Sequence, residues 1–250
     1  MHNFSINIDS AKSCYLKHIR NETFYSVVNA NGSQKLFESE GRSYLEVSVD
    51  ENFRERVGLN LKSAIADVIS MGFKTDYLGK KLAFSEDSLV NRVLVDTMSI
   101  FDSSTDRKIT YGAINNLDNL SIDGLFTFRL GKLRVRWDEI AAVTESNGLI
   151  FYDDESKVGF LSYLIMSVPS VCREITLDMN LHQPVFYDSN GTTVDCVSLL
   201  KVGTVSPEEE LMFNLVNLAP KKLTVTGDRE LLSREFLELS DALFGGNQTN

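Results

Sequence analysis

The chain has 250 residues, of which 43% are hydrophobic and 24% are charged, and its 35 acidic and 25 basic side chains give a formal net charge of −10. This composition is ordinary for a globular protein with a sizeable core and argues against disorder. The acidic balance repels phosphate backbones, so nucleic acid is a disfavoured partner unless basic side chains cluster locally.

Targeting signals and disulfides are not expected. The first ten residues lack a positive segment followed by an apolar core, which a secretory signal needs. The most apolar run, residues 158–172, is interrupted by glycine, serine and proline and falls short of the roughly 18–20 apolar residues of a spanning helix. Cys14, Cys172 and Cys196 are far apart and odd in number, which indicates reduced thiols. We therefore expect a cytoplasmic protein without a membrane span.

The first fifty residues predict a small sheet with one helix. Residues 11–19 place apolar side chains on one helix face. Asn31-Gly32 separates two runs rich in apolar and β-branched residues and predicts a hairpin turn. The predicted strands are residues 4–8, 23–28, 34–37 and 44–49.

Residues 51–170 predict a helical middle. Helical spacing of apolar residues covers 61–69 and 158–168, and a further helix is expected from Ser85. Asp102 to Lys108 is polar and predicts a loop. Residues 121–143 predict one continuous amphipathic helix with Trp137 on its buried face.

Residues 171–250 predict an αβ unit with a hairpin and capped helices. Strands are expected at 174–179, 184–187 and 221–226. Ser206-Pro-Glu-Glu209 offers a serine cap, a proline in the first turn and an acidic capping residue, and Asp228 is expected to cap the final helix. The predicted fold class is therefore α+β, in three segments (1–50, 51–170 and 171–250) that we expect to form one continuous body.

A local basic excess stands out in this acidic chain. It consists of Arg129, Lys132, Arg134 and Arg136 on the predicted central helix. These side chains can form a contact surface for an acidic protein face or a phosphate. They can equally be the solvated side of an amphipathic helix, partly paired with nearby acids.

Other candidate sites are weaker. Asp153, Asp154 and Glu155 could bind a hard cation, but they precede a predicted helix, where acids favour the helix dipole. His2, His18 and His182 show no metal-ligand spacing with each other or with the cysteines. We find no phosphate-binding or nucleophile motif, so no catalytic residue, cofactor or metal is predicted.

Two segments carry a resemblance to a known family. The central IDGLFTFRLGKLRVRWDEIAAV (residues 122–143) is similar to a glycine–aromatic–x–x–Phe-Arg-Leu segment leading into a long helix, and VNLAPKKLTV (216–225) is similar to Leu-Ala-Pro-x-Lys followed by a strand. With the helix LKSAIADVI and the hairpin VFYDSNGTTVD, they make the chain resemble the YtxC-like family of sporulation proteins from endospore-forming Firmicutes. The likeness covers most of the chain and is weakest before about residue 55. It implies a link to spore formation and carries no catalytic residues.

The leading hypothesis is a non-enzymatic, sporulation-associated protein that binds an unidentified protein partner through the four basic side chains. A hydrolase or nucleotide-binding enzyme, with a site built from scattered carboxylates such as Asp153 and Asp154, is the alternative. Nucleic-acid binding through the basic side chains is a third possibility. The sequence leaves the partner and the oligomeric state open.

Overall fold

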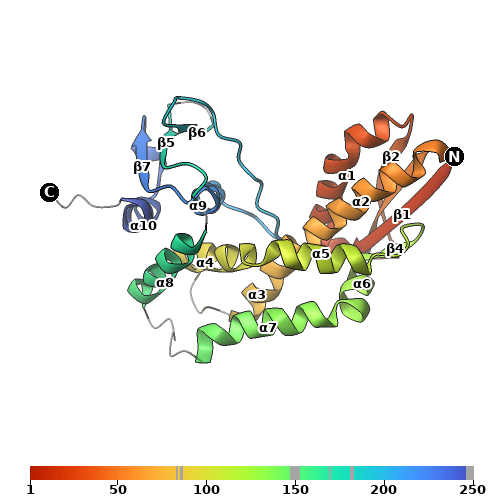
Figure 1. Ribbon diagram of the computed structural model, residues 1–250, viewed down its shortest axis with the longest axis horizontal. Helices are drawn as coiled ribbons and strands as arrows, with labels where there is room; N and C mark the ends of the chain where they lie inside the picture. Colours follow the sequence, from red (N-terminus) through yellow and green to blue (C-terminus); the bar gives the residue numbers. More distant parts are fainter. Residues whose placement is uncertain (83, 85–86, 147–152, 169, 181–182, 246–250) are drawn as a thin grey trace. The chain divides into compact units, whose positions relative to one another are not determined.

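The computed structural model describes residues 1–82, 84, 87–146, 153–168, 170–180 and 183–245 (Figure 1). Helices and two small sheets confirm the predicted α+β class. Backbone contacts divide the chain into two compact units. Unit 1 comprises residues 1–81, 99–142 and 200–203, and unit 2 comprises residues 82–98, 143–199 and 204–250. The predicted helical middle, residues 51–170, thus contributes to both units.

Unit 1 contains a four-stranded sheet in the order β2-β3-β1-β4. Its strands are β1 (His2–Asp9), β2 (Ser33–Ser39), β3 (Arg42–Val49) and β4 (Leu120–Ser121). β3 is antiparallel to both β1 and β2, whereas β4 is parallel to β1. The strand period of two puts Phe4, Ile6, Leu45 and Val47 on one face, where all four are buried.

Helix α1 (Ser13–Val28) packs on this sheet and includes residues that predicted a strand. The predicted strand at 23–28 and the hairpin at Asn31-Gly32 are wrong. Thr23 and Val27 are buried one helical turn apart, so core packing overrides their β propensity. Asn31 has a φ of 50°, and the Gly32 amide donates to the carbonyl of Val27 at 2.9 Å, which ends the helix.

Unit 1 has further helices. They are α2 (Arg54–Asp67), a π-helical turn (Val68–Phe73), α3 (Lys74–Leu82, in this unit to Lys81), α5 (Ser103–Ala113), α6 (Ile122–Arg129) and α7 (Gly131–Ser146, in this unit to Ala142). The predicted loop from Asp102 to Lys108 is wrong, because most of it lies in α5. The predicted helix end at Gly72 is wrong too: the chain continues through the π turn. A Cβ on Gly72 would lie 2.5 Å from the Tyr15 ring, so glycine is required for this close packing.

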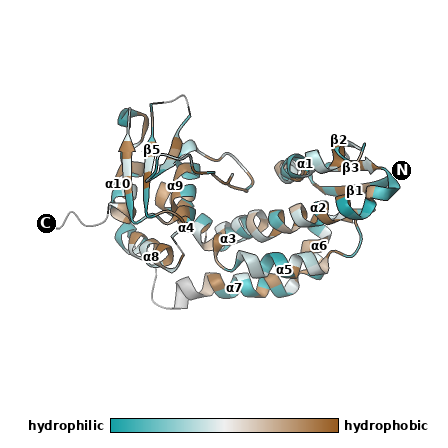
Figure 2. Ribbon diagram, turned by 45° about the horizontal axis from the view of Figure 1, so that its top comes forward, coloured by the Kyte–Doolittle hydropathy of each residue, from teal (hydrophilic) through white to brown (hydrophobic). Residues whose placement is uncertain are grey.

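Unit 2 is built around a second sheet in the order β6-β5-β7. β5 (Glu174–Asp178) is antiparallel to β6 (Val185–Asp188) and parallel to β7 (Lys222–Thr226). Its helices are α4 (Leu89–Ile100, in this unit to Met98), α8 (Asp154–Ser167), α9 (Pro207–Leu218) and α10 (Arg234–Phe244). Figure 2 shows the hydrophobic residues of β5 and α9, which supply much of the core of this unit.

Helix caps in unit 2 agree with the sequence in part. The predicted Ser206 cap is confirmed: its Oγ accepts the amide of Glu209 at 3.2 Å. Asp228 instead caps a short 3-10 turn (Arg229–Leu231), and Ser233 caps α10. The helix expected from Ser85 begins at Leu89, and Ser85 itself lies outside the described residues, as does the predicted break at Asn147-Gly148.

Candidate interaction surface

The predicted central helix is two helices. Ser121 caps α6, its Oγ accepting the Gly124 amide at 3.1 Å, and α6 ends at Arg129. Leu130 has φ −106° and ψ 29°, and α7 then starts at Gly131. Leu130 is buried and its carbonyl accepts the Leu133 amide at 3.0 Å, so the break is part of the core packing. The expectation of one continuous helix is therefore wrong.

Two of the four predicted contact residues, Arg134 and Arg136, make contacts inside unit 1. The Arg134 guanidinium donates to the Thr127 carbonyl at 2.9 Å and lies 5.9 Å from the centre of the Phe126 ring. Arg136 forms an ion pair with Asp102, and its Nε lies 3.5 Å from an oxygen of Asp106. Both arginines are half-buried and connect α7 to its neighbours.

The other two, Arg129 and Lys132, are exposed and have no ion-pair partner among the described residues. They accompany two apolar side chains that sequence reasoning missed: Phe128 is 85% exposed and Val135 is 58% exposed. We call Phe128, Arg129, Lys132 and Val135 the α6–α7 surface. It combines an exposed aromatic ring with two unpaired cations, a composition that suits a protein contact.

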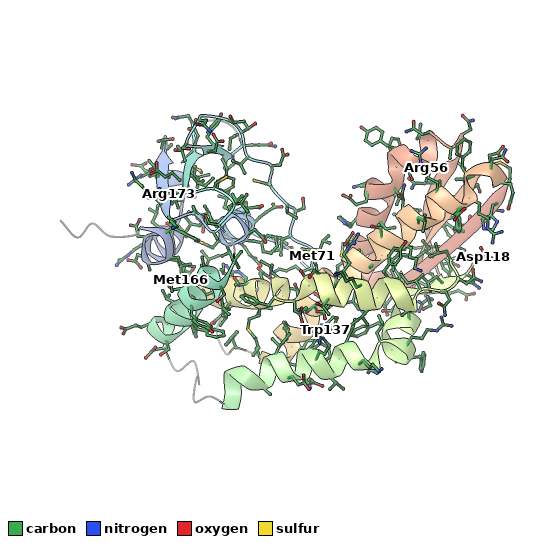
Figure 3. All side chains as sticks on the ribbon, viewed as in Figure 1. Arg56, Met71, Asp118, Trp137, Met166 and Arg173 are labelled. Carbon is green, nitrogen blue, oxygen red and sulfur yellow. The ribbon has the colours of Figure 1, made fainter. Side chains whose placement is uncertain are left out.

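A rigid layer supports this surface from inside. Trp137, labelled in Figure 3, is fully buried, as predicted from its apolar helix face. Its ring stacks on Phe126 with centroids 5.5 Å apart and meets the edge of Tyr77 at 5.6 Å. The Tyr77 hydroxyl donates to Asp138 at 2.8 Å. The contact between Phe126 and Trp137 thereby holds α6 and α7 together.

A buried ion pair fixes the opposite side of Trp137. The Lys74 ammonium lies 2.8 Å from an oxygen of Asp106, and the same oxygen accepts the Trp137 indole N–H at 2.9 Å. Lys74 also donates to the carbonyl of Phe101. Burial lowers the pKa of Lys74, while its bond to Asp106 opposes that change. This network lies inside the protein and has a structural role.

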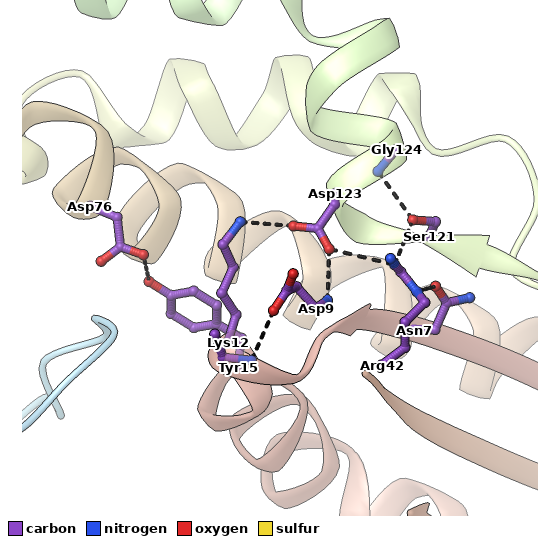
Figure 4. Close-up of polar contacts among 10 residues, drawn as sticks. Asn7, Asp9, Lys12, Tyr15, Arg42, Asp76, Ser121, Asp123 and Gly124 are labelled. Atoms are coloured by element: carbon purple, nitrogen blue, oxygen red, sulfur yellow. Dashed lines mark hydrogen bonds and ion pairs between the residues drawn. The ribbon is translucent and has the colours of Figure 1, made fainter. Parts of the chain in front are cut away.

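A second polar cluster anchors the start of α6 to the sheet (Figure 4). The Asp123 carboxylate accepts the Lys12 ammonium at 2.8 Å and the Asp9 amide at 2.8 Å, and an Arg42 nitrogen lies 3.5 Å away. Arg42 also donates to Ser121 Oγ at 3.0 Å. The carboxylate is surrounded by donors of this chain, so the cluster positions α6.

The acids of the enzyme alternative lie at the start of α8, where Asp153 is the N-cap. Asp153 Oδ1 accepts the Ser156 amide at 2.8 Å, and this hydrogen bond holds the pKa of Asp153 below its usual value. Asp154 pairs with Lys157 at 2.8 Å. Within the described part of the chain, no group of three or more His, Cys, Asp and Glu residues could hold a metal ion; His182 lies outside it.

Unit 2 contains a groove of about 540 Å³. Phe186 and Leu211 are its buried apolar residues, and Asp153 and Asp154 are not among its lining residues. The buried Asn214 amide shapes one wall, because it accepts from the Val197 amide at 2.8 Å and donates to the Val197 carbonyl at 3.1 Å. Partial burial and the nearby Glu210 raise the pKa of the Cys196 thiol, which makes this cysteine a poor nucleophile at neutral pH.

No protein-family model, curated protein or solved structure matches the chain. The resemblance to the YtxC-like family therefore stays a prediction. None of the described helices has both the length and the apolar character needed to cross a membrane.

Proposed function

We propose that this protein is a non-enzymatic interaction module that binds an acidic, partly apolar face of another protein through the α6–α7 surface. The observation that carries the proposal is the exposure of Phe128, at 85%, beside Arg129 and Lys132, which have no ion-pair partner in the described structure. Phenylalanine and arginine are enriched at protein contacts, and Lys132 adds to the positive charge. In a chain with a net charge of −10, these two cations offer a local positive charge for an acidic partner face.

The cellular setting is a further part of the proposal. The sequence resemblance alone supports a role in spore formation. The three free cysteines are compatible with a reducing, cytoplasmic compartment. Neither point affects the geometry of the contact.

Charge reversal tests the proposal. We expect the Arg129→Glu/Lys132→Glu variant to lose a partner that the wild-type chain captures from sporulating cells, because the partner's acidic face would then meet like charges. Lys221→Glu/Lys222→Glu is the matched control, since it changes the net charge equally at two exposed lysines of unit 2. Equal capture by all three proteins would contradict the assignment of this surface.

Nucleic acid is the competing occupant of the same cations. Binding of a mixed-sequence DNA at low salt that is lost in Arg129→Glu/Lys132→Glu would replace the protein partner. We expect no such binding, because Arg134 and Arg136 are held in intramolecular contacts and only two cations remain.

A further inference from the structure

Strand β2 forms an open edge of the sheet in unit 1. It pairs only with β3 among the described strands, in an unbroken antiparallel register from Ser33↔Ser48 to Ser39↔Arg42. Glu40 and Gly41 have φ values of 52° and 74°, as in a two-residue type I′ hairpin turn. In such a hairpin the residues that flank the turn, Ser39 and Arg42, exchange backbone hydrogen bonds. The backbone amides and carbonyls of every second residue of β2, counted from Ser39, therefore point toward β3.

The alternate residues of β2 present their backbone groups outward. These are Gln34, Leu36 and Glu38, and none of their amides or carbonyls has a backbone partner among the described residues. β2 has no proline and no bulge, which commonly protect an edge. Its one lysine, Lys35, holds its ammonium 5.0 Å from the centre of the Phe37 ring. The edge is therefore available for pairing.

Apolar side chains of α1 accompany this edge. α1 packs over β2, where Gln34 Nε2 donates to Thr23 Oγ1 at 2.8 Å. Because Thr23 faces β2, a helical turn of about 100° per residue places Phe24 at the margin of the buried face of α1. Phe24 is 45% exposed and the nearby Val28 is 50% exposed.

We propose that β2 pairs with β2 of a second copy of this chain, antiparallel and about a twofold axis at Leu36. The three residues with outward backbone groups in one copy then pair with the same three in the other. Leu36 pairs with Leu36 of the second copy, and Gln34 pairs with Glu38 at both ends. All outward amides and carbonyls of these residues find partners. The two sheets become one continuous sheet with the α1 helices on the same face.

The side chains select this register over its neighbours. On the opposite face it places Lys35 beside Phe37 of the second copy, a favourable cation–aromatic pair. Shifting the register by two residues in one direction pairs Lys35 with Lys35 of the second copy, which places like charges together. Shifting it by two residues in the other direction pairs the apolar Leu36 with the charged Glu38. A shift of one residue would put the apolar face of one sheet beside the polar face of the other. A second copy is the favoured occupant because the edge is self-complementary in this register.

Sedimentation velocity over a range of protein concentrations tests the proposal. The wild-type chain is expected to form a dimer as its concentration rises. Leu36→Pro removes one outward amide without removing a bond to β3, so it is expected to stay monomeric while its circular dichroism remains that of the wild type. A monomeric wild type at every concentration, or a Leu36→Pro variant that dimerises equally, would overturn the inference.

Disulfide trapping tests the register independently of Leu36→Pro. In a background with Cys14, Cys172 and Cys196 replaced by serine, Leu36→Cys should cross-link on oxidation, because directly paired Cα atoms lie about 5.5 Å apart. Lys35→Cys is the control: its symmetry mate is diagonal, about 7–8 Å away, and should not cross-link. Cross-linking of both variants to the same extent, or of neither, would reject the register.

Discussion

Lys74 and Asp106 form an ion pair in the interior of unit 1, with 0% and 1% of their side chains exposed and 2.8 Å between ammonium and carboxylate. Removing two charges from water is costly, and the pair is tolerated because each charge has further partners. Lys74 also donates to the Phe101 carbonyl, and Asp106 also accepts from Trp137. The pair thus joins α3, α5 and α7.

Lys74→Met should destabilise the chain by about 3–5 kcal/mol, because it leaves the Asp106 carboxylate buried without its cation. Urea denaturation followed by Trp137 fluorescence measures the loss. The double variant Lys74→Met/Asp106→Leu should regain part of it, since no buried charge then remains in the pair. A single variant as stable as the wild type would show that the pair is not buried as described.

Ser206→Ala should lower stability by about 0.5–2 kcal/mol, because the Glu209 amide loses its acceptor at the start of α9. Ser206→Asn, which restores a capping oxygen, should stay close to the wild type. Denaturation midpoints of the three proteins provide the comparison. Equal midpoints for the alanine and wild-type proteins would show that Ser206 does not stabilise the start of α9.

The start of α8 should lose protection in acid. The pKa of Asp153 is held below its ordinary value of 3.8 by the Ser156 amide. A carboxyl with a lowered folded pKa stabilises the fold above its unfolded pKa, and this contribution is lost as the pH falls through the folded pKa. The protection of the first-turn amides of α8, measured against their intrinsic exchange rates, should therefore fall in the wild type as the pH drops through the folded pKa of Asp153, and Asp153→Asn should remove this change.

Cys196 should alkylate slowly near neutral pH, because partial burial and then Glu210 raise its pKa. Glu210→Gln removes one of these causes and should speed iodoacetamide labelling of Cys196 at a fixed, mildly alkaline pH. Glu155→Gln is the control, since it removes the same charge from α8. Labelling that responds equally to both changes would mean that net charge, and not the position of Glu210, sets the rate.

Local chemistry accounts for the parts of the fold that the sequence predicts well. Ser206 and Pro207 start α9 through contacts within one helical turn, which the sequence contains directly. The strand at 23–28 fails because the choice between strand and helix is made by the burial of Thr23 and Val27 against the sheet. The predicted loop at 102–108 is wrong because its polar residues suggested exposure to solvent. Asp106 is instead buried, where it pairs with Lys74 and accepts from Trp137.

The candidate surface was predictable only in part. The basic excess drew attention to residues 129–136, but a continuous helix gave no reason to separate Arg134 and Arg136 from Arg129 and Lys132. Two contacts separate them. Arg136 pairs with Asp102, which is distant in the sequence, and Arg134 donates to the carbonyl of Thr127, which lies before the break at Leu130. Phe128 lies off the apolar face even in the predicted continuous helix, but spacing alone did not show that its ring would be 85% exposed.

Site-specific photo-crosslinking at Phe128 is the most direct test of the proposed interaction surface. A photoreactive phenylalanine at position 128 should give one discrete adduct in sporulating cells, and Arg129→Glu/Lys132→Glu should abolish it. The same probe at Tyr163, which is 63% exposed on α8, is the matched control and should give no such adduct. No adduct at position 128, or one that persists after charge reversal, would contradict a partner at the α6–α7 surface.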